Sequence, residues 1–590
     1  MKNREVRTCQ NCKNDFNIEP EDFSFYIKLG VPPPTWCPHC RFIRKLTFVN
    51  ERSLYKGICA KCKSFMISMY HPENQMTVWC VKCHIGDSWD ARDYAREYDF
   101  SQNFFKQFKE LKSKVPRRNL GQNERNGAGC EYSNHCFTSK NIYLSFQVAT
   151  SENIKYSRHV FKYNKNCMDS LSIKSNERGY ELVKSSSNYN SSFLVDSSQC
   201  VESNFLYDCS NCINCFMSAN LRNKSYVFRG QQLSREEYME AMESLALHTY
   251  SSQLRAKDEF NKLYKKSIHK HADIKNSENA VGDFIENSKN VSNSYGLVGA
   301  ENVKNIFIAA NIIEDCQDMV FVGKLSECYE MVDGGRGGNK IVFCLGCGGG
   351  CKNLLYCDNC KGCSDCFGCV GLNKKQYCIF NKQFSKEEYL ETIEKIKKQM
   401  DEVPYIDAKG RKYTFGEFFP TELSHFAYNE TDAFEEEPLS EAQVLEAGYE
   451  WREPESKNYV TTLESNSLVD SINDIEDSIC NETIACPNKG RVETLCTSAF
   501  KILPDELVFY RQMKLPLPRF CPNCRYYERM AYQNPFRFYK RQCMCSSLDS
   551  PSTTVDHNHE GECMNEFETM YSPNRAEIIY CKECYQKEVY

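Results

Sequence analysis

The sequence predicts a mainly β, multidomain fold: a duplicated β-solenoid (β-helix) core flanked at both termini by small α+β cysteine-rich modules. Two internal duplications and a content of 36 cysteines in 590 residues are the observations that predict it. Internal repeats identify repeat architectures, and this much cysteine is several-fold above ordinary usage. At roughly 150 residues per domain, the chain is long enough for about four folding units.

Composition and charge exclude several classes of protein. No run of about 18 apolar residues occurs, so the sequence predicts no membrane span. The N-terminal residues MKNREVRTCQNCKNDF lack the apolar stretch of a secretory signal. We therefore expect a cytoplasmic protein whose cysteines stay reduced and are more readily metal ligands than disulfides. A formal net charge of -5 excludes a uniformly basic nucleic-acid coat.

The first duplication relates the two ends of the chain. The segment FYIKLGVPPPTWCPHCR, residues 25–41, aligns without a gap with FYRQMKLPLPRFCPNCR, residues 509–525, at an offset of 484. Further on, Cys80 and Cys83 align with Cys581 and Cys584 at an offset of 501. The 17-residue difference predicts an insertion that contains His557 and His559. One cysteine-rich module is therefore expected at each end.

The second duplication lies inside the chain. Residues 209–238 align with residues 360–389 at a constant offset of 151. Each copy ends in the start of a helix, with Ser234 or Ser385 as N-cap and a glutamate three residues later, which is a capping box. We expect the first of these helices to extend to about Lys270 and the second to about Met400.

A finer repeat of about 12 residues precedes each helix, centred on residues such as Ile142, Ile154 and Cys167 in one copy and Val291 and Val303 in the other. Short β-prone runs separated by Asn, Ser and Gly are typical of solenoid rungs. Large aromatic residues within the repeats favour two repeats per coil over one. The predicted units are 1–116 (cysteine-rich module), 117–233 (solenoid copy 1), 234–271 (helical connector), 272–384 (solenoid copy 2), 385–400 (helix), 401–479 (acidic linker) and 480–590 (second cysteine-rich module).

The N-terminal module contains four CxxC pairs, and two such pairs bind one tetrahedral zinc ion without leaving a position for substrate water. Disulfides within these pairs would close loops too short to stabilise the fold much. A turn, a hairpin and a helix that carries the second pair form a treble-clef arrangement. The predicted ligands of two zinc sites are Cys9, Cys12, Cys37, Cys40, Cys59, Cys62, Cys80 and Cys83.

A resemblance supports this prediction over about 40 residues. The matching positions are Cys9, Cys12, Phe16, Tyr26, Gly30, Pro34, Cys37, Cys40 and Arg41. They resemble the zinc-ribbon (treble-clef) domain found in many bacterial proteins, and the whole layout is similar to an uncharacterised cysteine-rich family of small-genome bacteria. The resemblance implies bound zinc and no particular activity.

The C-terminal copy keeps two CxxC pairs and stretches the other two. Its predicted ligands are Cys486, Cys496, Cys521, Cys524, Cys543, Cys563, Cys581 and Cys584, which brings the expected content to about four Zn²⁺ per chain. Cys545, His557 or His559 could replace a ligand in the stretched site, or the histidines could simply lie in a loop. Structural zinc supplies folding energy to modules of this kind.

The cysteines of the second solenoid copy leave three interpretations open. The densest run is Cys357, Cys360, Cys363, Cys366 and Cys369. Buried thiols that pack as a ladder, additional bound metal and redox chemistry are the alternatives. The spacing resembles iron–sulfur ligation, but the usual fourth Cys followed by Pro is missing.

The sequence predicts a non-enzymatic zinc-binding scaffold or interaction protein, with a protein or ribonucleoprotein as partner and no membrane contact. Nucleic acid is one candidate partner, because basic residues alternate with aromatic ones in both modules; alternatively, these aromatic residues belong to the core. The candidate contacts are Arg41, Arg44, Lys45, Arg52, Arg525, Arg529 and Arg537. Because the end modules are homologous, they could pair with each other or with those of another copy of the chain, which would produce a homo-oligomer.

Two other functions are alternatives. One is a zinc or iron–sulfur carrier that uses the solenoid cysteines. The other is a carbohydrate-active enzyme, which needs two carboxylates at a suitable separation. Acidic residues do gather at Asp315, Asp318, Glu327, Glu330 and Asp333, although these are also turn positions of the repeat. The sequence has no P-loop, dinucleotide fingerprint or HExxH motif, so an enzyme is not the favoured interpretation.

Overall fold

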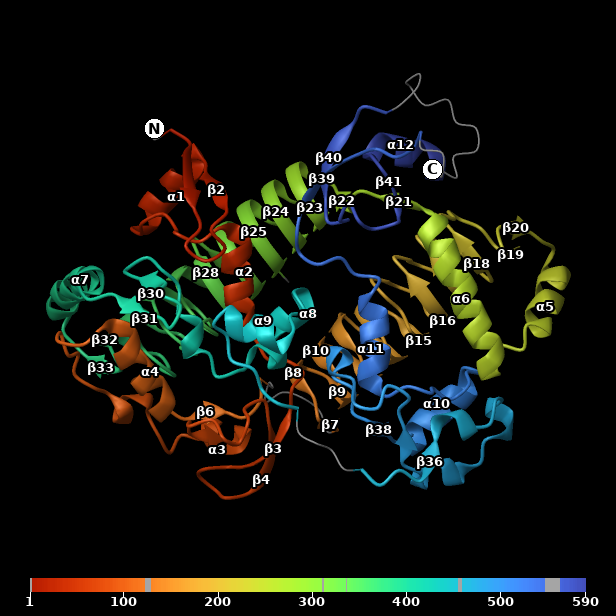
Figure 1. Ribbon diagram of the computed structural model, residues 1–590, viewed down its shortest axis with the longest axis horizontal. Coiled ribbons are helices and arrows are strands. Elements are labelled where there is room, and N and C mark those ends of the chain that lie inside the picture. The colour runs from red at the N-terminus through yellow and green to blue at the C-terminus, as the bar shows by residue number, and fades with distance from the viewer. Residues whose placement is uncertain (1–2, 122–128, 310–311, 336, 455–458, 547–562) are drawn as a thin grey trace.

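Two stacks of short parallel strands form the centre of this mainly β, multidomain structure (Figure 1). The computed structural model describes residues 3–121, 129–309, 312–335, 337–454, 459–546 and 563–590, which contain 12 α-helices. Stack 1 comprises β7 (Cys130–Glu131), β8 (Asn134–Phe137), β9 (Lys140–Tyr143), β10 (Phe146–Ala149), β11 (Glu152–Lys155), β12 (Arg158–Phe161), β13 (Lys165–Met168), β14 (Leu171–Lys174), β15 (Glu177–Tyr180), β16 (Tyr189–Val195), β17 (Asn204–Tyr207), β18 (Phe216–Ala219) and β19 (Val227–Phe228).

Stack 2 is built in the same way from the second internal copy. It comprises β22 (Ile274–Lys275), β23 (Glu278–Glu286), β24 (Lys289–Val298), β25 (Glu301–Ala309), β26 (Ile313–Val322), β27 (Leu325–Ser326), β28 (Tyr329–Gly334), β29 (Gly338–Val342), β30 (Cys351–Leu355), β31 (Ser364–Phe367) and β32 (Gln376–Ile379). An antiparallel strand ends each stack, β20 (Gln231–Gln232) or β33 (Lys382–Gln383).

The register shows that stacked neighbours are one 12-residue repeat apart. Phe146 pairs with Asn134 on one side and with Arg158 on the other. The expectation of two repeats per coil is therefore wrong. The aromatic residues that suggested it lie on an outer face, where they stack on their equivalents in the next repeat, as Phe193 does on Phe205 with ring centroids 4.3 Å apart.

A period of three residues, which the sequence analysis did not identify, organises each repeat. Every third residue of stack 1 adopts a positive φ, starting at Tyr132, His135 and Thr138, so the chain bends four times per repeat. Every third residue is also buried, in an order that alternates small polar and apolar side chains: Ser133, Cys136, Ser139, Ile142, Ser145 and Val148. Small and aliphatic side chains fill this interior, whose apolar positions are occupied by Cys, Val, Ile and Leu and by no aromatic residue of the described chain.

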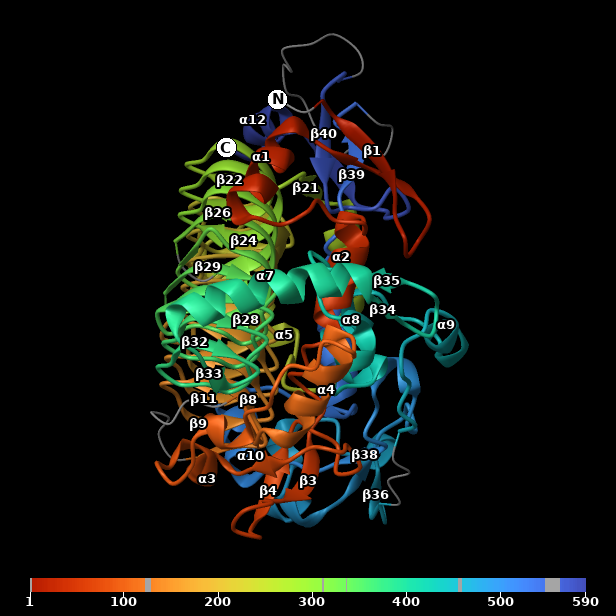
Figure 2. The ribbon, with the colours of Figure 1, turned by 90° about the vertical axis from the view of Figure 1, so that its left-hand side faces the viewer.

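Helices follow each stack at the predicted capping boxes. Ser234 accepts from Glu237 N–H and Ser385 from Glu388 N–H, each at 3.2 Å. The single helix expected up to Lys270 is instead two helices, α5 (Arg235–Ser244) and α6 (Tyr250–Lys266). In the second copy α7 (Lys386–Glu402) lies across the end of stack 2, as Figure 2 shows.

Each terminal module contains two units of a β-hairpin followed by a helix. The N-terminal elements are β1 (Glu5–Thr8), β2 (Asp15–Ile18), α1 (Pro20–Leu29), α2 (Pro38–Leu46), β3 (Tyr55–Ile58), β4 (Phe65–Ser68), β5 (Val78–Trp79), α3 (Val81–Ile85), α4 (Phe104–Lys114) and β6 (Arg117–Arg118). The C-terminal elements are β37 (Ile484–Ala485), β38 (Ala499–Phe500), α10 (Pro504–Gln512), α11 (Pro522–Met530), β39 (Tyr539–Gln542), β40 (Glu566–Thr569), β41 (Ile578–Tyr580) and α12 (Lys582–Val589).

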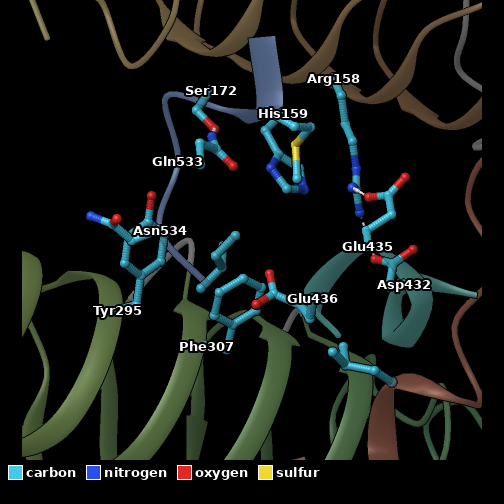
Figure 3. Close-up of a pocket in the computed structure, with 13 residues that line it drawn as sticks. Arg158, His159, Ser172, Tyr295, Phe307, Asp432, Glu435, Glu436, Gln533 and Asn534 are labelled. Atoms are coloured by element: carbon cyan, nitrogen blue, oxygen red, sulfur yellow. Dashed lines mark hydrogen bonds and ion pairs between the residues drawn. The ribbon is translucent and has the colours of Figure 1, made fainter. Parts of the chain in front are cut away.

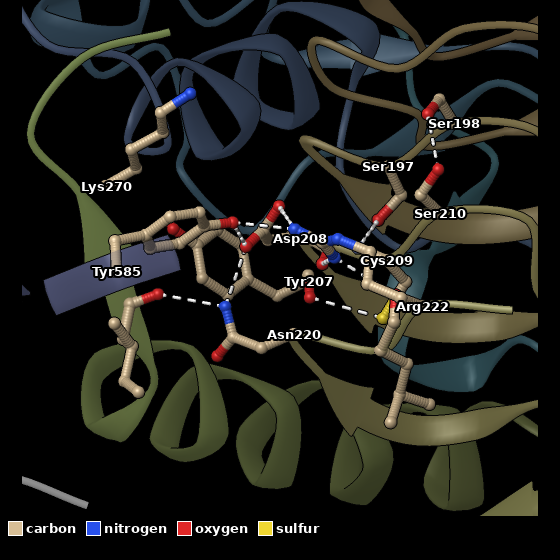
Figure 4. Close-up of polar contacts among 12 residues, drawn as sticks. Ser197, Ser198, Tyr207, Asp208, Cys209, Ser210, Asn220, Arg222, Lys270 and Tyr585 are labelled. Carbon is tan, nitrogen blue, oxygen red and sulfur yellow. Dashed lines mark hydrogen bonds and ion pairs between the residues drawn. The ribbon is translucent and has the colours of Figure 1, made fainter. Parts of the chain in front are cut away.

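The modules dock crosswise on the stacks. Helix α2 of the N-terminal module lies against β26 and β28 of stack 2 (Figure 1). The C-terminal module contacts stack 1 through α11 and α12, and β41 pairs in parallel with β21 (Ile268–Lys270). Figure 4 shows the α12 contact, where Asp208 of stack 1 binds Tyr585 and, at 2.9 Å, Arg222. Each terminal module thus places a helix against the stack that lies farther from it in the sequence.

The described part of residues 401–479 has more regular structure than the expected acidic linker. The segment FGEFF, residues 415–419, packs into the protein core, since Phe418 and Phe419 are fully buried. The segment contains β34 (Tyr405–Ile406), β35 (Lys412–Tyr413), α8 (Asp432–Glu436), α9 (Glu441–Glu446) and β36 (Leu463–Glu464). No helix of the described residues is long and apolar enough to cross a membrane.

Candidate metal centres

The first centre joins the β1–β2 turn to the start of α2. The sulfurs of Cys9, Cys12, Cys37 and Cys40 lie within 4.8 Å of one another. Cys37 is the N-cap of α2, and its backbone N–H donates to Cys9 Sγ at 3.2 Å. The two sulfurs of Cys12 and Cys37 are 3.8 Å apart. The hairpin turn and the helix start thus present two thiols each, as the CxxC spacing predicts.

The second centre repeats this geometry with the β3–β4 turn and α3. Cys59, Cys62, Cys80 and Cys83 form the four-thiol group. Cys80 N–H donates to Cys59 Sγ at 3.2 Å, and the sulfurs of Cys62 and Cys80 are 3.8 Å apart. This centre lies nearer the surface, since Cys62 is exposed and only Cys59 is fully buried.

The third centre keeps the geometry although its first pair is stretched. Cys486, Cys496, Cys521 and Cys524 gather within 4.8 Å. Cys521 N–H donates to Cys486 Sγ at 3.4 Å, and Asn488 donates to Cys524 Sγ at 3.1 Å. The longer loop between Cys486 and Cys496 therefore does not prevent the second thiol from reaching the group.

The fourth group contains Cys543, Cys545, Cys563 and Cys584. Cys545, which the sequence offered only as a substitute, stands in the group, whereas Cys581 lies beside it and donates its backbone N–H to Cys543 Sγ at 3.2 Å. The other substitutes, His557 and His559, lie outside the described residues. Five thiols therefore surround this position.

The sulfur geometry of these groups fits zinc. A tetrahedral ion with Zn–S bonds of about 2.3 Å places its ligand sulfurs about 3.8 Å apart. The separations found include 3.8 Å for Cys486–Cys524, 3.9 Å for Cys496–Cys521 and 3.8 Å for Cys563–Cys584. They are far longer than the roughly 2.05 Å of a disulfide. Both ends of the chain thus carry four-cysteine groups suited to a metal ion, and all ligands are thiols, which excludes sites for hard cations.

The stack 2 cysteines have a different geometry. Within the described residues, Cys357, Cys360, Cys363, Cys366 and Cys369 belong to no compact group of metal-ligating side chains. Their thiols instead form hydrogen bonds with the backbone of the same and the neighbouring repeat. Lys375 N–H donates to Cys363 Sγ at 3.4 Å, and Cys363 donates to Lys361 O at 3.4 Å. Serines do the same in stack 1, where Ser157 N–H donates to Ser145 Oγ at 3.0 Å.

Most of the candidate nucleic-acid contacts are not on the surface. Arg41, Arg44, Lys45, Arg525 and Arg529 are all at least 97% buried. Arg52 is mostly buried, stacked on the Tyr526 ring and paired with Glu435 at 2.8 Å. Of the seven basic residues, Arg537 is the exposed one. Burial lowers the pKa of Lys45 to about 8. In this fold Arg41, Arg44, Arg52, Arg525 and Arg529 face protein carboxylates rather than solvent.

All five candidate acidic residues of stack 2 lie beside basic side chains, and two of them pair with the candidate cations Arg41 and Arg44. Asp318 binds Arg41 at 2.7 Å, and Glu330 binds Arg44 at 2.8 Å. Asp315 and Glu327 both bind Lys28 at 2.8 Å, and Asp333 lies 3.4 Å from His135. These carboxylates are thus engaged in contacts within the protein, which the sequence analysis missed because they join residues about 200 to almost 300 positions apart.

A pocket lies where the two stacks and the C-terminal module meet (Figure 3). Arg158 and His159 of stack 1 face Tyr295 and Phe307 of stack 2, with Glu436 between them. Arg158 binds Glu51, Asp432 and Glu435, so its charge is neutralised within the protein. Glu436 accepts only the backbone N–H of Phe536 among the described contacts, and burial raises its pKa to about 7.

Comparison with known proteins assigns no family. No family model matches the chain, and no curated protein matches it. Among solved structures, the chain is similar at 12% identity to a candidate acetyltransferase from Desulfovibrio desulfuricans G20, over 48% of this chain and 86% of that one. The TM-score of 0.09 is too low to support any statement about fold or activity.

Proposed function

We propose that this protein is a non-enzymatic zinc-binding scaffold in which about four zinc ions keep the terminal modules folded and docked on two β-solenoids. The solenoid interpretation is supported by the 12-residue parallel register and the three-residue period of burial. Sulfur separations close to a tetrahedral edge support zinc as the ion.

The position of the docking arginines carries this proposal. In CPHCR and CPNCR, Arg41 and Arg525 directly follow Cys40 and Cys524, the last thiols of the first and third centres. A metal ion at each centre would fix the first turn of α2 or α11 and, one residue later, the guanidinium that enters a stack. Four thiolates close the coordination shell, so the ion organises a surface and activates no water.

A protein partner fits the surface better than a nucleic acid does. The basic residues needed for phosphate contacts are mostly buried and paired, as at Arg41 and Arg525. The metal-carrier alternative has less support, because the ladder thiols already exchange hydrogen bonds with the backbone of neighbouring repeats. We therefore propose a cytoplasmic scaffold for another protein or a ribonucleoprotein.

The test is to count zinc and iron per chain in protein purified without added metal or chelator. We expect about four zinc ions and no stoichiometric iron. Treatment with 1,10-phenanthroline should then expose both terminal modules to limited proteolysis while the stacks stay resistant; the non-chelating 1,7-isomer is the matched control. Less than one zinc per chain would contradict the proposal. A content well above four, or stoichiometric iron, would favour the carrier alternative.

A further inference from the structure

We propose that the fourth centre is a five-thiol site in which Cys545, Cys563 and Cys581 exchange for two of the four coordination positions. The inference rests on the proposed zinc function and goes beyond it, because it gives this centre a property that the other three lack. Cys543 and Cys584 are the two ligands that all arrangements share.

The position of Cys581 is that of a ligand. In the other three centres the cysteine that N-caps the helix belongs to the four-thiol group: Cys37, Cys80 and Cys521. Its backbone N–H donates to the first thiol of the site at 3.2, 3.2 and 3.4 Å, respectively. Cys581 N-caps α12 and makes the same bond to Cys543 at 3.2 Å.

Cys545 and Cys563 nevertheless occupy the group. Cys545 is two residues from Cys543, and Cys563 precedes β40, with its sulfur 3.8 Å from Cys584 Sγ. All five cysteines of this centre are at least 92% buried. A hydrophobic cluster encloses them together with Ile268, Tyr580 and Tyr585. Cys545, Cys563 and the capping Cys581 thus compete for coordination positions inside one enclosed site.

Exchange within such a site conserves both charge and coordination. Zinc takes four ligands, so one of the five thiols stays protonated. If that thiol displaced a bound one, one Zn–S bond would form and another would break, and the proton of the incoming thiol would pass to the departing thiolate. No oxidant or reductant is required. The fourth centre should therefore keep its ion after the loss of any one of the three exchanging thiols.

Single substitutions in the full chain test this. We expect Cys545→Ser, Cys563→Ser and Cys581→Ser each to retain the wild-type zinc content, while Cys545→Ser/Cys581→Ser loses one ion. Serine at position 581 can still N-cap α12, so the helix is kept. Cys521→Ser is the matched control, because it takes the capping thiol from a centre with only four thiols, and it should lose one ion. Loss of zinc from any of the three single variants would overturn the proposal.

A second measurement uses the unsubstituted zinc-loaded protein, in case a variant does not fold. After limited treatment with N-ethylmaleimide, peptide mapping should find about one label among the five cysteines of this centre, distributed over Cys545, Cys563 and Cys581. A label confined to one of them identifies a fixed spare thiol and overturns the exchange. Wild-type protein without zinc contradicts the proposed function itself, so the two failures are distinguishable.

Discussion

The two docking joints of the molecule share their first contact and differ in their second. In joint A, where α2 meets stack 2, Arg41 binds Asp318 at 2.7 Å. In joint B, where α11 meets stack 1, the equivalent Arg525 binds Asp169 at 3.1 Å. Each aspartate lies two residues after a buried cysteine of its stack, Cys316 or Cys167. The duplication thus preserved the ion pair as well as the metal ligands.

The second ion pair uses different residues in the two joints. Joint A adds Arg44, which binds Glu330, but the residue at its place in joint B is Glu528. Joint B uses Arg529 instead, which shares Asp169 with Arg525 at 3.0 Å. Two guanidinium groups therefore depend on one carboxylate in joint B, whereas the two of joint A have three carboxylates, Asp318, Glu330 and Glu417. The difference indicates that the first ion pair defines the docking geometry and that the second is interchangeable.

The largest expected effect comes from Asp169. Asp169→Asn leaves two buried guanidinium groups without an anion, and removing one partner of a buried pair costs about 3–5 kcal/mol. Asp318→Asn should cost less, because Glu330 also lies 3.7 Å from Arg41. The measurement is the urea concentration at which a protease releases each terminal module. Equal shifts for the two variants would contradict the difference between the joints.

A second prediction compares the interiors of the two stacks. Cys363 accepts one ladder hydrogen bond and donates another, as serine does in stack 1. Cys363→Ser should therefore change stability little, whereas Cys363→Ala leaves the Lys375 N–H unpaired and costs about 1–3 kcal/mol. Thermal unfolding checks this, and the zinc content should be unchanged in both variants. Loss of metal from either would support the carrier alternative.

A third prediction concerns the pocket between the joints, where two adjacent carboxyl groups differ. Arg158 and Arg52 hold the pKa of Glu435 below its usual range despite burial. Burial raises the pKa of Glu436 to about 7. The folded state therefore binds the proton of Glu436 more tightly than the unfolded chain does. The resulting contribution to the free energy of unfolding is fully present below about pH 4.5 and is lost as pH rises to about 7.

Glu436→Gln removes this pH dependence. Relative to the variant, wild-type protein should lose about 1–2 kcal/mol between pH 5.5 and pH 8, a value reduced from 1.36 kcal/mol per pKa unit because the side chain is partly exposed. Urea unfolding of both proteins at the two pH values measures it. A wild-type protein that gains stability over this interval relative to the variant would contradict the assignment.

The sequence predicts local features of this molecule better than its assembly. Both capping boxes and the gathering of the CxxC pairs follow from spacing alone, since each depends on residues a few positions apart. The joints do not, because Arg41 and Asp318 are 277 positions apart and nothing in either segment identifies the other. The basic and aromatic pattern around Arg41 and Phe42 is equally typical of an exposed RNA-binding surface and of a buried docking face. Only the packing distinguishes them, as Phe42 contacts Phe307 and Phe536.

The smallest expected effect lies at the rim of joint A. Lys28 binds both Asp315 and Glu327 at 2.8 Å, but 46% of its side chain is exposed. Exposed pairs contribute about 0–1 kcal/mol and are screened by salt, whereas the buried Arg41 pair is not open to solvent. Lys28→Ala should therefore shift release of the N-terminal module only slightly, and 0.5 M NaCl should abolish even that difference. Arg41→Ala in the same assay should give a large shift that salt does not remove. If both substitutions weakened docking equally, the rim rather than the buried arginine would hold the module, and the shared first contact of the two joints would lose its significance.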